Sequence, residues 1–236
     1  MTRAKTWLSW STGKDSAWTL GVLRSGEWRD AVEVTALLST FNASAERVAM
    51  HAVRRELARE QAAAAGLPLI EVDLPFPCSN DDYERIMAGV CARAVEDGVE
   101  RMAFGDLFLE DIRAYREKQL APTPLEPIFP LFGADTAKLS REMVAGGLRA
   151  VLTCVDPKQL DARFAGRTYD AALLDELAEL GSDVDPCGEN GEFHTFTTHA
   201  PGFARPVDVR VGEVVERDGF VFADVLPRSA PEPSKP

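Results

Sequence analysis

The stretch Ser11-Thr12-Gly13-Lys14-Asp15-Ser16 follows a short apolar run, Thr6 to Trp10, and leads directly into an amphipathic run. This order predicts a turn between a strand and a helix. Exposed amides at a helix start and the helix dipole favour negative charge, and the hydroxyls and the Lys14 ammonium add further donors. The stretch therefore predicts a phosphate-binding loop, with an ordinary turn capped by Asp15 or Ser16 as the alternative.

The spacing of glycines excludes two common phosphate loops. A Walker A motif needs a Gly five positions before Gly13, where this chain has Leu8. A dinucleotide fingerprint needs three glycines, and the turn supplies only one. What remains resembles the Ser-Gly-Gly-x-Asp-Ser loop of the PP-loop ATP pyrophosphatases, with Thr12 where many members have Gly. That resemblance implies adenylation of a substrate oxygen with release of pyrophosphate.

Composition and charge narrow the class of protein. The 236 residues suffice for a full core, and no apolar stretch is long enough for a membrane span. The formal charge of −12, with 15 acidic and 7 basic residues in positions 156–228, argues against a nucleic-acid partner. We therefore expect a cytoplasmic protein that binds neither nucleic acid nor membrane.

The four cysteines, at positions 78, 91, 154 and 187, form no Cys-x-x-Cys pair, which disfavours a zinc site.

The order of strands and helices predicts an α/β fold. Apolar runs and stop signals alternate along residues 1–155 and predict a doubly wound, parallel, five-stranded sheet of Rossmann-like type. The expected strands are 6–10, 32–38, 69–74, 101–104 and 150–154, and the expected helices include 45–65, 81–97 and 110–120. We expect residues 156–228 to form a smaller α+β domain that closes over the substrate, with strands 207–215 and 220–225 joined at Asp218-Gly219. Residues 229–236 are expected to be a disordered tail.

Ligands on such sheets bind at the carboxyl ends of the strands, near the point where the winding reverses. The first candidate position is the Ser11–Ser16 loop, the second is the end of the next strand at Thr40, and the third is Gly105-Asp106. A nucleotide spanning the first two would place its base near Thr40 and its phosphates at Gly13. Thr40 is equally compatible with a plain turn.

A second motif lies at Asp185-Pro186-Cys187-Gly188-Glu189-Asn190-Gly191-Glu192-Phe193-His194-Thr195. Glu189, Glu192 and His194 are typical of a loop that orients an amine, accepts its proton or holds a metal-bound phosphate. The alternative is a tight acidic loop in which His194 only hydrogen-bonds Glu192.

The two motifs together make the chain resemble the diphthine–ammonia ligase family of PP-loop proteins, in its bacterial branch. The resemblance rests on the Gly188–Thr195 string with Ser11–Ser16, and extends to Gln61, Gly105-Asp106 and Tyr115-Arg116. It implies ATP binding by the N-terminal domain, adenylation of a carboxylate and displacement of AMP by ammonia or an amine. In a bacterial member the acid would be a small molecule rather than diphthine.

On this basis we assign expected roles. Magnesium would be held by Asp15 and the phosphates, since hard oxygen ligands suit it. The expected catalytic residues are Lys14, Asp15, Glu189, Glu192 and His194. The ATP-binding set is Ser11, Thr12, Gly13, Lys14, Asp15, Ser16, Thr40 and Gly105, and the substrate set is Asp106, Tyr115 and Arg116. The expected partners are a small carboxylate and ammonia or an amine, and a homodimer is compatible with the chain.

Two other classes of function compete with an amide ligase. A non-catalytic ATP- or AMP-binding protein resembling the universal stress proteins would have no use for the Glu-Phe-His-Thr loop at 192–195. A tRNA-modifying PP-loop enzyme is disfavoured by the acidic C-terminal region and the missing cysteine pairs. Fold alone does not decide between these classes.

Overall fold

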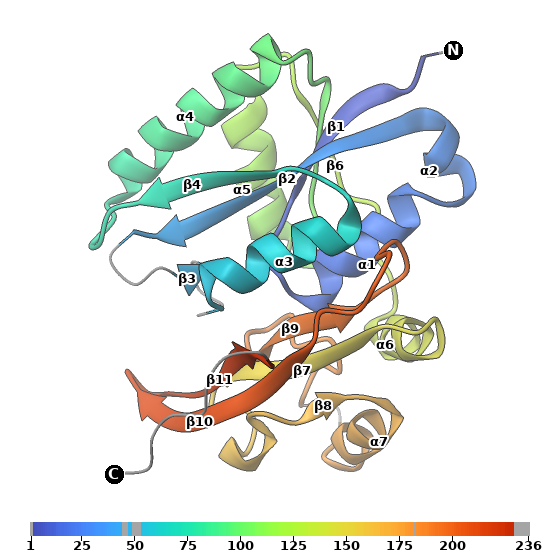
Figure 1. The fold of residues 1–236 in the computed structure, drawn as a ribbon, viewed down its shortest axis with the longest axis vertical. Helices are drawn as coiled ribbons and strands as arrows, with labels where there is room; N and C mark the ends of the chain where they lie inside the picture. The colour runs from blue at the N-terminus through green and yellow to red at the C-terminus, as the bar shows by residue number, and fades with distance from the viewer. Residues whose placement is uncertain (1, 44–46, 49–52, 182, 229–236) are drawn as a thin grey trace.

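The computed structural model describes residues 2–43, 47–48, 53–181 and 183–228, which form two stacked β-sheets with helices around and between them. Figure 1 shows the layers: α4 and α5 cover one face of the first sheet, and α1 and α3 lie between this sheet and the second. The helices are α1 (Lys14–Leu23), α2 (Gly26–Ala31), α3 (Arg55–Ala65), α4 (Asn80–Glu96), α5 (Glu110–Leu120), α6 (Thr136–Ala145) and α7 (Ala171–Glu179), with a 3-10 turn η1 (Ala162–Phe164).

The first sheet is mostly parallel. Its strands are β1 (Ala4–Ser9), β2 (Val32–Asn42), β3 (Arg47–Val48), β4 (Leu69–Leu74), β5 (Arg101–Ala103) and β6 (Glu126–Ile128). Five of them pair in parallel in the order β4-β2-β1-β5-β6. The chain winds outward from β1 first in one direction and then in the other, so the reversal lies between β1 and β5. The loops after these two strands are therefore neighbours.

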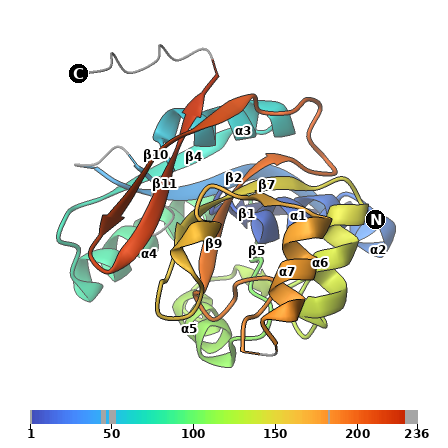
Figure 2. The same ribbon diagram turned by 90° about the horizontal axis from the view of Figure 1, so that it is seen from below.

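The second sheet is antiparallel. It contains β7 (Arg149–Val155), β8 (Thr168–Tyr169), β9 (Phe193–His199), β10 (Val209–Arg217) and β11 (Phe220–Pro227). Strand β7 is central and pairs with β8, β9 and β11. Figure 2 shows α6 and α7 side by side, and in Figure 1 α7 lies on the side of this sheet that is turned away from the first. Strand β9 follows the loop Asp185–Glu192, which we call the acidic loop. This strand lies against the first half of the chain.

Several elements agree with the sequence predictions. Strand β4 and helix α5 have the predicted bounds. Helix α3 ends at Gly66, whose φ of 66° is the left-handed conformation that favours glycine at a helix end. Asp218 and Gly219, with φ of 54° and 82°, form the predicted hairpin turn between β10 and β11. Within the described ranges, no helix is long and apolar enough to cross a bilayer.

Three predictions were wrong. The strand 150–154 belongs to the second, antiparallel sheet as β7, because β6 and α6 intervene between α5 and this strand. The first sheet has six strands rather than five, since β3 pairs antiparallel with β2. The predicted helix 45–65 begins only at Arg55, because Val48 donates its backbone N–H to the carbonyl of Val53 at 2.8 Å and the chain turns there. Residues 45–46 and 49–52 of that range lie outside the described residues, as does the predicted tail 229–236. The domain boundaries remain predictions.

The two sheets are joined by the side chain of Gln61, which is fully buried on α3. Its Oε1 accepts a hydrogen bond from the indole Nε1 of Trp10 at 2.9 Å. Its Nε2 donates to the carbonyls of Thr12 at 3.0 Å and of Thr197, in β9, at 2.6 Å. One carboxamide therefore binds the end of β1, the predicted phosphate loop and the second sheet.

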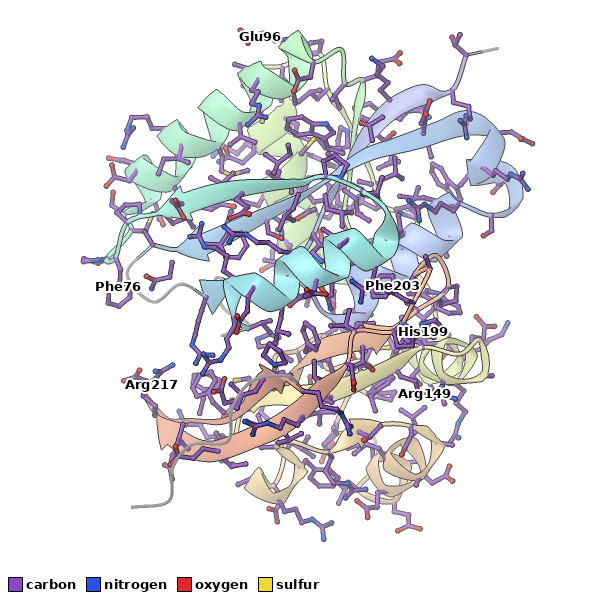
Figure 3. The ribbon with its side chains drawn as sticks, in the orientation of Figure 1. Phe76, Glu96, Arg149, His199, Phe203 and Arg217 are labelled. Carbon is purple, nitrogen blue, oxygen red and sulfur yellow. The ribbon has the colours of Figure 1, made fainter. Side chains whose placement is uncertain are left out.

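Apolar contacts reinforce this junction. The ring of Phe203 lies 6.1 Å from that of Trp10, measured between centroids. Figure 3 shows Phe203 at the boundary between the two halves of the molecule. Both side chains are buried, so the boundary is part of the hydrophobic core.

We expect Gln61→Leu to lower the free energy of unfolding by about 2–3 kcal/mol, because it leaves the Trp10 indole and two carbonyls buried without partners. Urea denaturation followed by Trp fluorescence measures this change. The neighbouring Glu60→Gln is the control: its ion pair with Arg205 is exposed and should change stability by less than about 0.5 kcal/mol. Equal stability of the two variants would contradict the role of Gln61.

Candidate functional site

The predicted phosphate loop lies between the end of β1 and the start of α1, as expected. Gly13 caps the helix in an extended conformation without a side-chain cap. Two of the loop amides already have partners in the protein: Gly13 N–H donates to Ser11 Oγ at 3.3 Å, and Lys14 N–H donates to Thr195 Oγ1 at 3.0 Å. Strand β9 thus contacts the loop directly, through a threonine to which the sequence analysis gave no role.

Thr12 has a left-handed conformation, with φ of 69°. This conformation is uncommon for a β-branched residue and is the one that glycine adopts most readily. The Thr12 carbonyl accepts from Gln61 and from the N–H of Thr197, at 3.0 and 2.9 Å. The Thr12 side chain is fully buried. The residue therefore fixes the shape of the loop through its backbone.

Lys14 points from the loop toward the acidic motif. Its Nζ donates to the two carboxylate oxygens of Asp15 at 2.9 and 2.8 Å and to the backbone carbonyl of Cys187. The ammonium lies 5.8 and 5.7 Å from the ring centroids of Tyr169 and Phe193. Burial is the largest single effect and lowers the pKa of Lys14, but the charge and hydrogen bond of Asp15, together with Cys187 and Glu189, outweigh it, so the net pKa of Lys14 is raised. Lys14 is therefore a buried cation.

Cys187 contributes its backbone carbonyl rather than its thiol. The thiol is buried and contacts the carbonyl of Thr136, with Sγ at 3.6 Å. Burial raises the pKa of Cys187 to about 12, more than the nearby Lys14 lowers it. A thiol with that pKa stays protonated at neutral pH and is a poor nucleophile.

The two motifs surround one cavity of about 210 Å³, which we call the phosphate-loop cavity. It lies where the loops after β1 and β5 meet the loop before β9. A Cβ on Gly105 would lie 3.1 Å from the backbone of Asp15 and of Ser16, so only glycine lets these loops approach so closely. Of the predicted site residues, those that line this cavity are Ser11, Gly13, Lys14, Asp15, Ser16, Gly105, Asp106, Arg116, Glu189 and His194.

Glu189 connects the acidic loop to the loop after β5. Its Oε1 accepts a hydrogen bond from the backbone N–H of Leu107 at 2.7 Å, a partner that the sequence did not indicate. Burial raises the pKa of Glu189 to about 7, with the nearby Asp15 carboxylate adding to the effect. A carboxyl group with that pKa exchanges its proton readily near neutral pH.

Glu192 lies elsewhere. It is fully buried, and its Oε1 accepts from the backbone N–H of Asp185 at 2.8 Å and from Asn190 Nδ2 at 3.2 Å. Asp185 in turn accepts from the N–H of Glu189 at 2.8 Å. These bonds close the acidic loop on itself and orient Glu189. Glu192 is not among the described residues that line the phosphate-loop cavity.

His194 reaches the same cavity from β9. Burial, with a further contribution from the positive charge of Lys14, lowers the pKa of His194 to about 4. The imidazole is therefore neutral at physiological pH.

A second, larger cavity of about 650 Å³ adjoins the first, and we call it the α4–α5 cavity. Ser9, Ser11, Phe104 and Arg116 line both cavities. Thr40 and Tyr115 line only the α4–α5 cavity. The Arg116 guanidinium lies between the two, 3.6 Å from Asp106 and 5.0 Å from the centroid of the Phe104 ring.

Magnesium fits this lining only as part of a nucleotide complex. Within the described ranges, no group of three or more His, Cys, Asp or Glu side chains is placed to hold a metal ion. Magnesium bound to phosphates, however, needs only one or two protein carboxylates. Asp15, Asp106 and Glu189 line the cavity and supply that chemistry.

The lowered pKa of His194 gives a pH dependence of known sign. Between about pH 4 and 6.5 the unfolded chain binds a proton at this position and the folded chain does not, so stability rises with pH across that window. We expect the contribution to reach up to about 3 kcal/mol, and to be absent in His194→Gln. Urea denaturation of both proteins at several pH values gives the difference. Parallel stability curves would contradict the assignment.

Comparisons with known proteins agree with the resemblance seen in the two motifs. Residues 135–223 match the family described as the diphthamide synthase C-terminal domain. Diphthine–ammonia ligase of Homo sapiens is 28% identical over 151 residues, which are 63% of this chain and 56% of the human protein. That of Danio rerio is 29% identical over 177 residues, covering 70% of this chain and 69% of the fish protein.

In Schizosaccharomyces pombe the corresponding ligase is 34% identical over 88 residues, or 36% of this chain and 14% of the yeast protein. The chain thus matches little more than half of the human relative's length. The resemblance is confirmed: the chain is similar to proteins named diphthine–ammonia ligase, and its residues 135–223 match the family described as the diphthamide synthase C-terminal domain.

Proposed function

We propose that the protein is an ATP-dependent carbon–nitrogen ligase that adenylates a carboxylate and transfers the acyl group to ammonia or an amine. The observation that carries this proposal is the meeting of the Ser11–Ser16 loop and the Glu189–His194 loop at one cavity. The first supplies donors for phosphates, and the second supplies groups that accept protons. The relation to proteins named diphthine–ammonia ligase supports the same reaction class.

In this proposal the phosphates of ATP lie against the start of α1, where free amides and the helix dipole favour anions. Ser11, Gly13 and Ser16 contact them, and Gly105 allows the close approach. The base lies toward Thr40 in the α4–α5 cavity. Bound magnesium, held by Asp15 and the phosphates, would neutralise charge on the leaving pyrophosphate.

In the first step a carboxylate oxygen of the acid attacks the α-phosphorus. The bond from that phosphorus to the bridging oxygen breaks, and pyrophosphate leaves with the electron pair. Lys14 and Arg116 provide positive charge beside the cavity to offset the charge that develops. Asp106, Tyr115 and Arg116 would face the acid.

In the second step the nitrogen attacks the acyl carbon, the bond from that carbon to the AMP oxygen breaks, and AMP leaves. The nitrogen must lose a proton, and Glu189 or the neutral His194 accepts it. Glu192 positions Glu189 through Asp185 rather than accepting the proton.

Exchange of labelled pyrophosphate into ATP, screened across diphthine-containing protein and small carboxylates, would identify the acid. ATP binding without exchange for any acid would instead favour a nucleotide-binding protein without catalysis.

We expect Ser11→Ala to weaken binding of ATP with magnesium by about ten-fold, because a hydroxyl donor to a charged phosphate is lost. Isothermal titration calorimetry measures the affinity. Ser25→Ala is the matched control, since that hydroxyl donates to Val22 at an exposed helix junction. Unchanged affinity in Ser11→Ala would remove Ser11 from the nucleotide site.

We expect Glu189→Gln to retain pyrophosphate exchange while slowing amide formation by roughly 100-fold, because the proton acceptor acts only in the second step. The comparison needs an acid that supports exchange in the wild-type protein. Glu110→Gln, at the exposed start of α5, is the control and should alter neither rate. Equal loss of exchange and amide formation would place Glu189 in the adenylation step.

A further inference from the structure

The face of the first sheet that α4 and α5 cover is not filled by side chains. Protein interiors are close-packed, yet the α4–α5 cavity has a volume of about 650 Å³, within the range of small-molecule sites. Its floor is apolar and buried, formed by Leu38, Leu74, Met102 and Phe104. A cavity of this kind favours a ligand with an apolar body.

The two helices supply the opposite wall. Tyr83 and Met87 come from α4, and Tyr115 and Gln119 come from α5. Gln119 Nε2 donates to Glu84 Oε1 at 3.2 Å and links the two helices at the exposed rim. Tyr115 is itself 37% exposed. The helix wall of the cavity is therefore partly exposed at Tyr115.

A cation with an unused donor lies at the junction of the two cavities. Arg116 lines both of them. Its Nε is buried and makes no hydrogen bond to any part of the chain that the structure describes. Arg116 Nε forms an ion pair with Asp106 Oδ2 at 3.6 Å, which is longer than a usual hydrogen bond. An anionic group of a ligand at this junction would satisfy the guanidinium.

We propose that the α4–α5 side of this cavity binds the acyl substrate, a monocarboxylic acid with an apolar or aromatic body, and that Arg116 holds its carboxylate beside the phosphate loop. The proposal rests on the proposed adenylation function. The strand side of the cavity, at Ser11 and Thr40, remains for the nucleotide. Because Arg116 also lines the phosphate-loop cavity, an acid bound to it presents its carboxylate toward the phosphates.

The test uses the full chain and the fluorescent probe anilinonaphthalene sulfonate, an aromatic anion. Met87→Trp should fill the α4 wall and weaken probe binding to protein saturated with ATP and magnesium by about ten-fold. ATP affinity should stay within about two-fold of wild type. Val95→Trp is the matched control, because Val95 is 37% exposed on the same helix and does not line the cavity.

Two further arms define the ligand. Arg116→Gln should weaken probe binding about ten-fold through loss of the charged contact. Octanoate and phenylbutyrate should displace the probe from the wild-type protein, whereas acetate and succinate should not. Displacement by succinate alone would overturn the apolar class of substrate. If Met87→Trp does not fold, as judged by circular dichroism, Ala88→Leu at the rim replaces it.

The outcomes separate this inference from the proposed function. Unchanged probe affinity in Met87→Trp overturns the acyl site. Loss of ATP affinity in Met87→Trp, or displacement of the probe by ATP, also overturns it, because the nucleotide then occupies the helix side. Failure of the wild-type protein to bind ATP overturns the proposed function instead, and titration of the probe without nucleotide still decides whether the cavity accepts an apolar anion.

Discussion

The buried carboxamide of Gln61 is the constraint on which the rest of the site depends. It binds Trp10, Thr12 and Thr197 at once, so the end of β1, the loop after it and strand β9 have one relative position. If one of these three partners were buried without its hydrogen bond to Gln61, the free energy lost would exceed what the remaining bonds contribute. Other relative positions of these three segments are therefore unfavourable. The loop conformation, including the left-handed Thr12, is therefore fixed before any ligand binds.

The position of β9 in turn determines where the acidic loop lies. Glu189 bonds to Leu107, and the Cys187 carbonyl accepts from Lys14, so this loop contacts the loops after both β5 and β1. The burial that results changes the protonation behaviour of its side chains: the pKa of Glu189 rises and that of His194 falls. Near neutral pH, Glu189 therefore exchanges a proton readily, whereas His194 stays uncharged.

The sequence predicted the positions of single loops, helices and turns better than it predicted which strands and residues contact one another. Glycines and apolar runs located the loop at Ser11–Ser16, helix α5 and the β10–β11 hairpin. The run Ala150–Cys154 is equally compatible with a buried strand of either sheet, because burial on both faces leaves no alternation to show its neighbours. The contact of Leu107 with Glu189 involves a backbone amide 82 positions away, which no residue pattern indicates.

The charges around the phosphate-loop cavity limit how a nucleotide can bind there. Its described lining includes two cations, Lys14 and Arg116, and three carboxyl groups, Asp15, Asp106 and Glu189. The Lys14 ammonium is bonded to Asp15, so its charge offsets only part of the charge of a triphosphate. In the proposed function, a cation that binds together with the phosphates must therefore add to the positive charge at the start of α1. On the proposed function, magnesium would therefore take part in recognition of the nucleotide as well as in the chemistry.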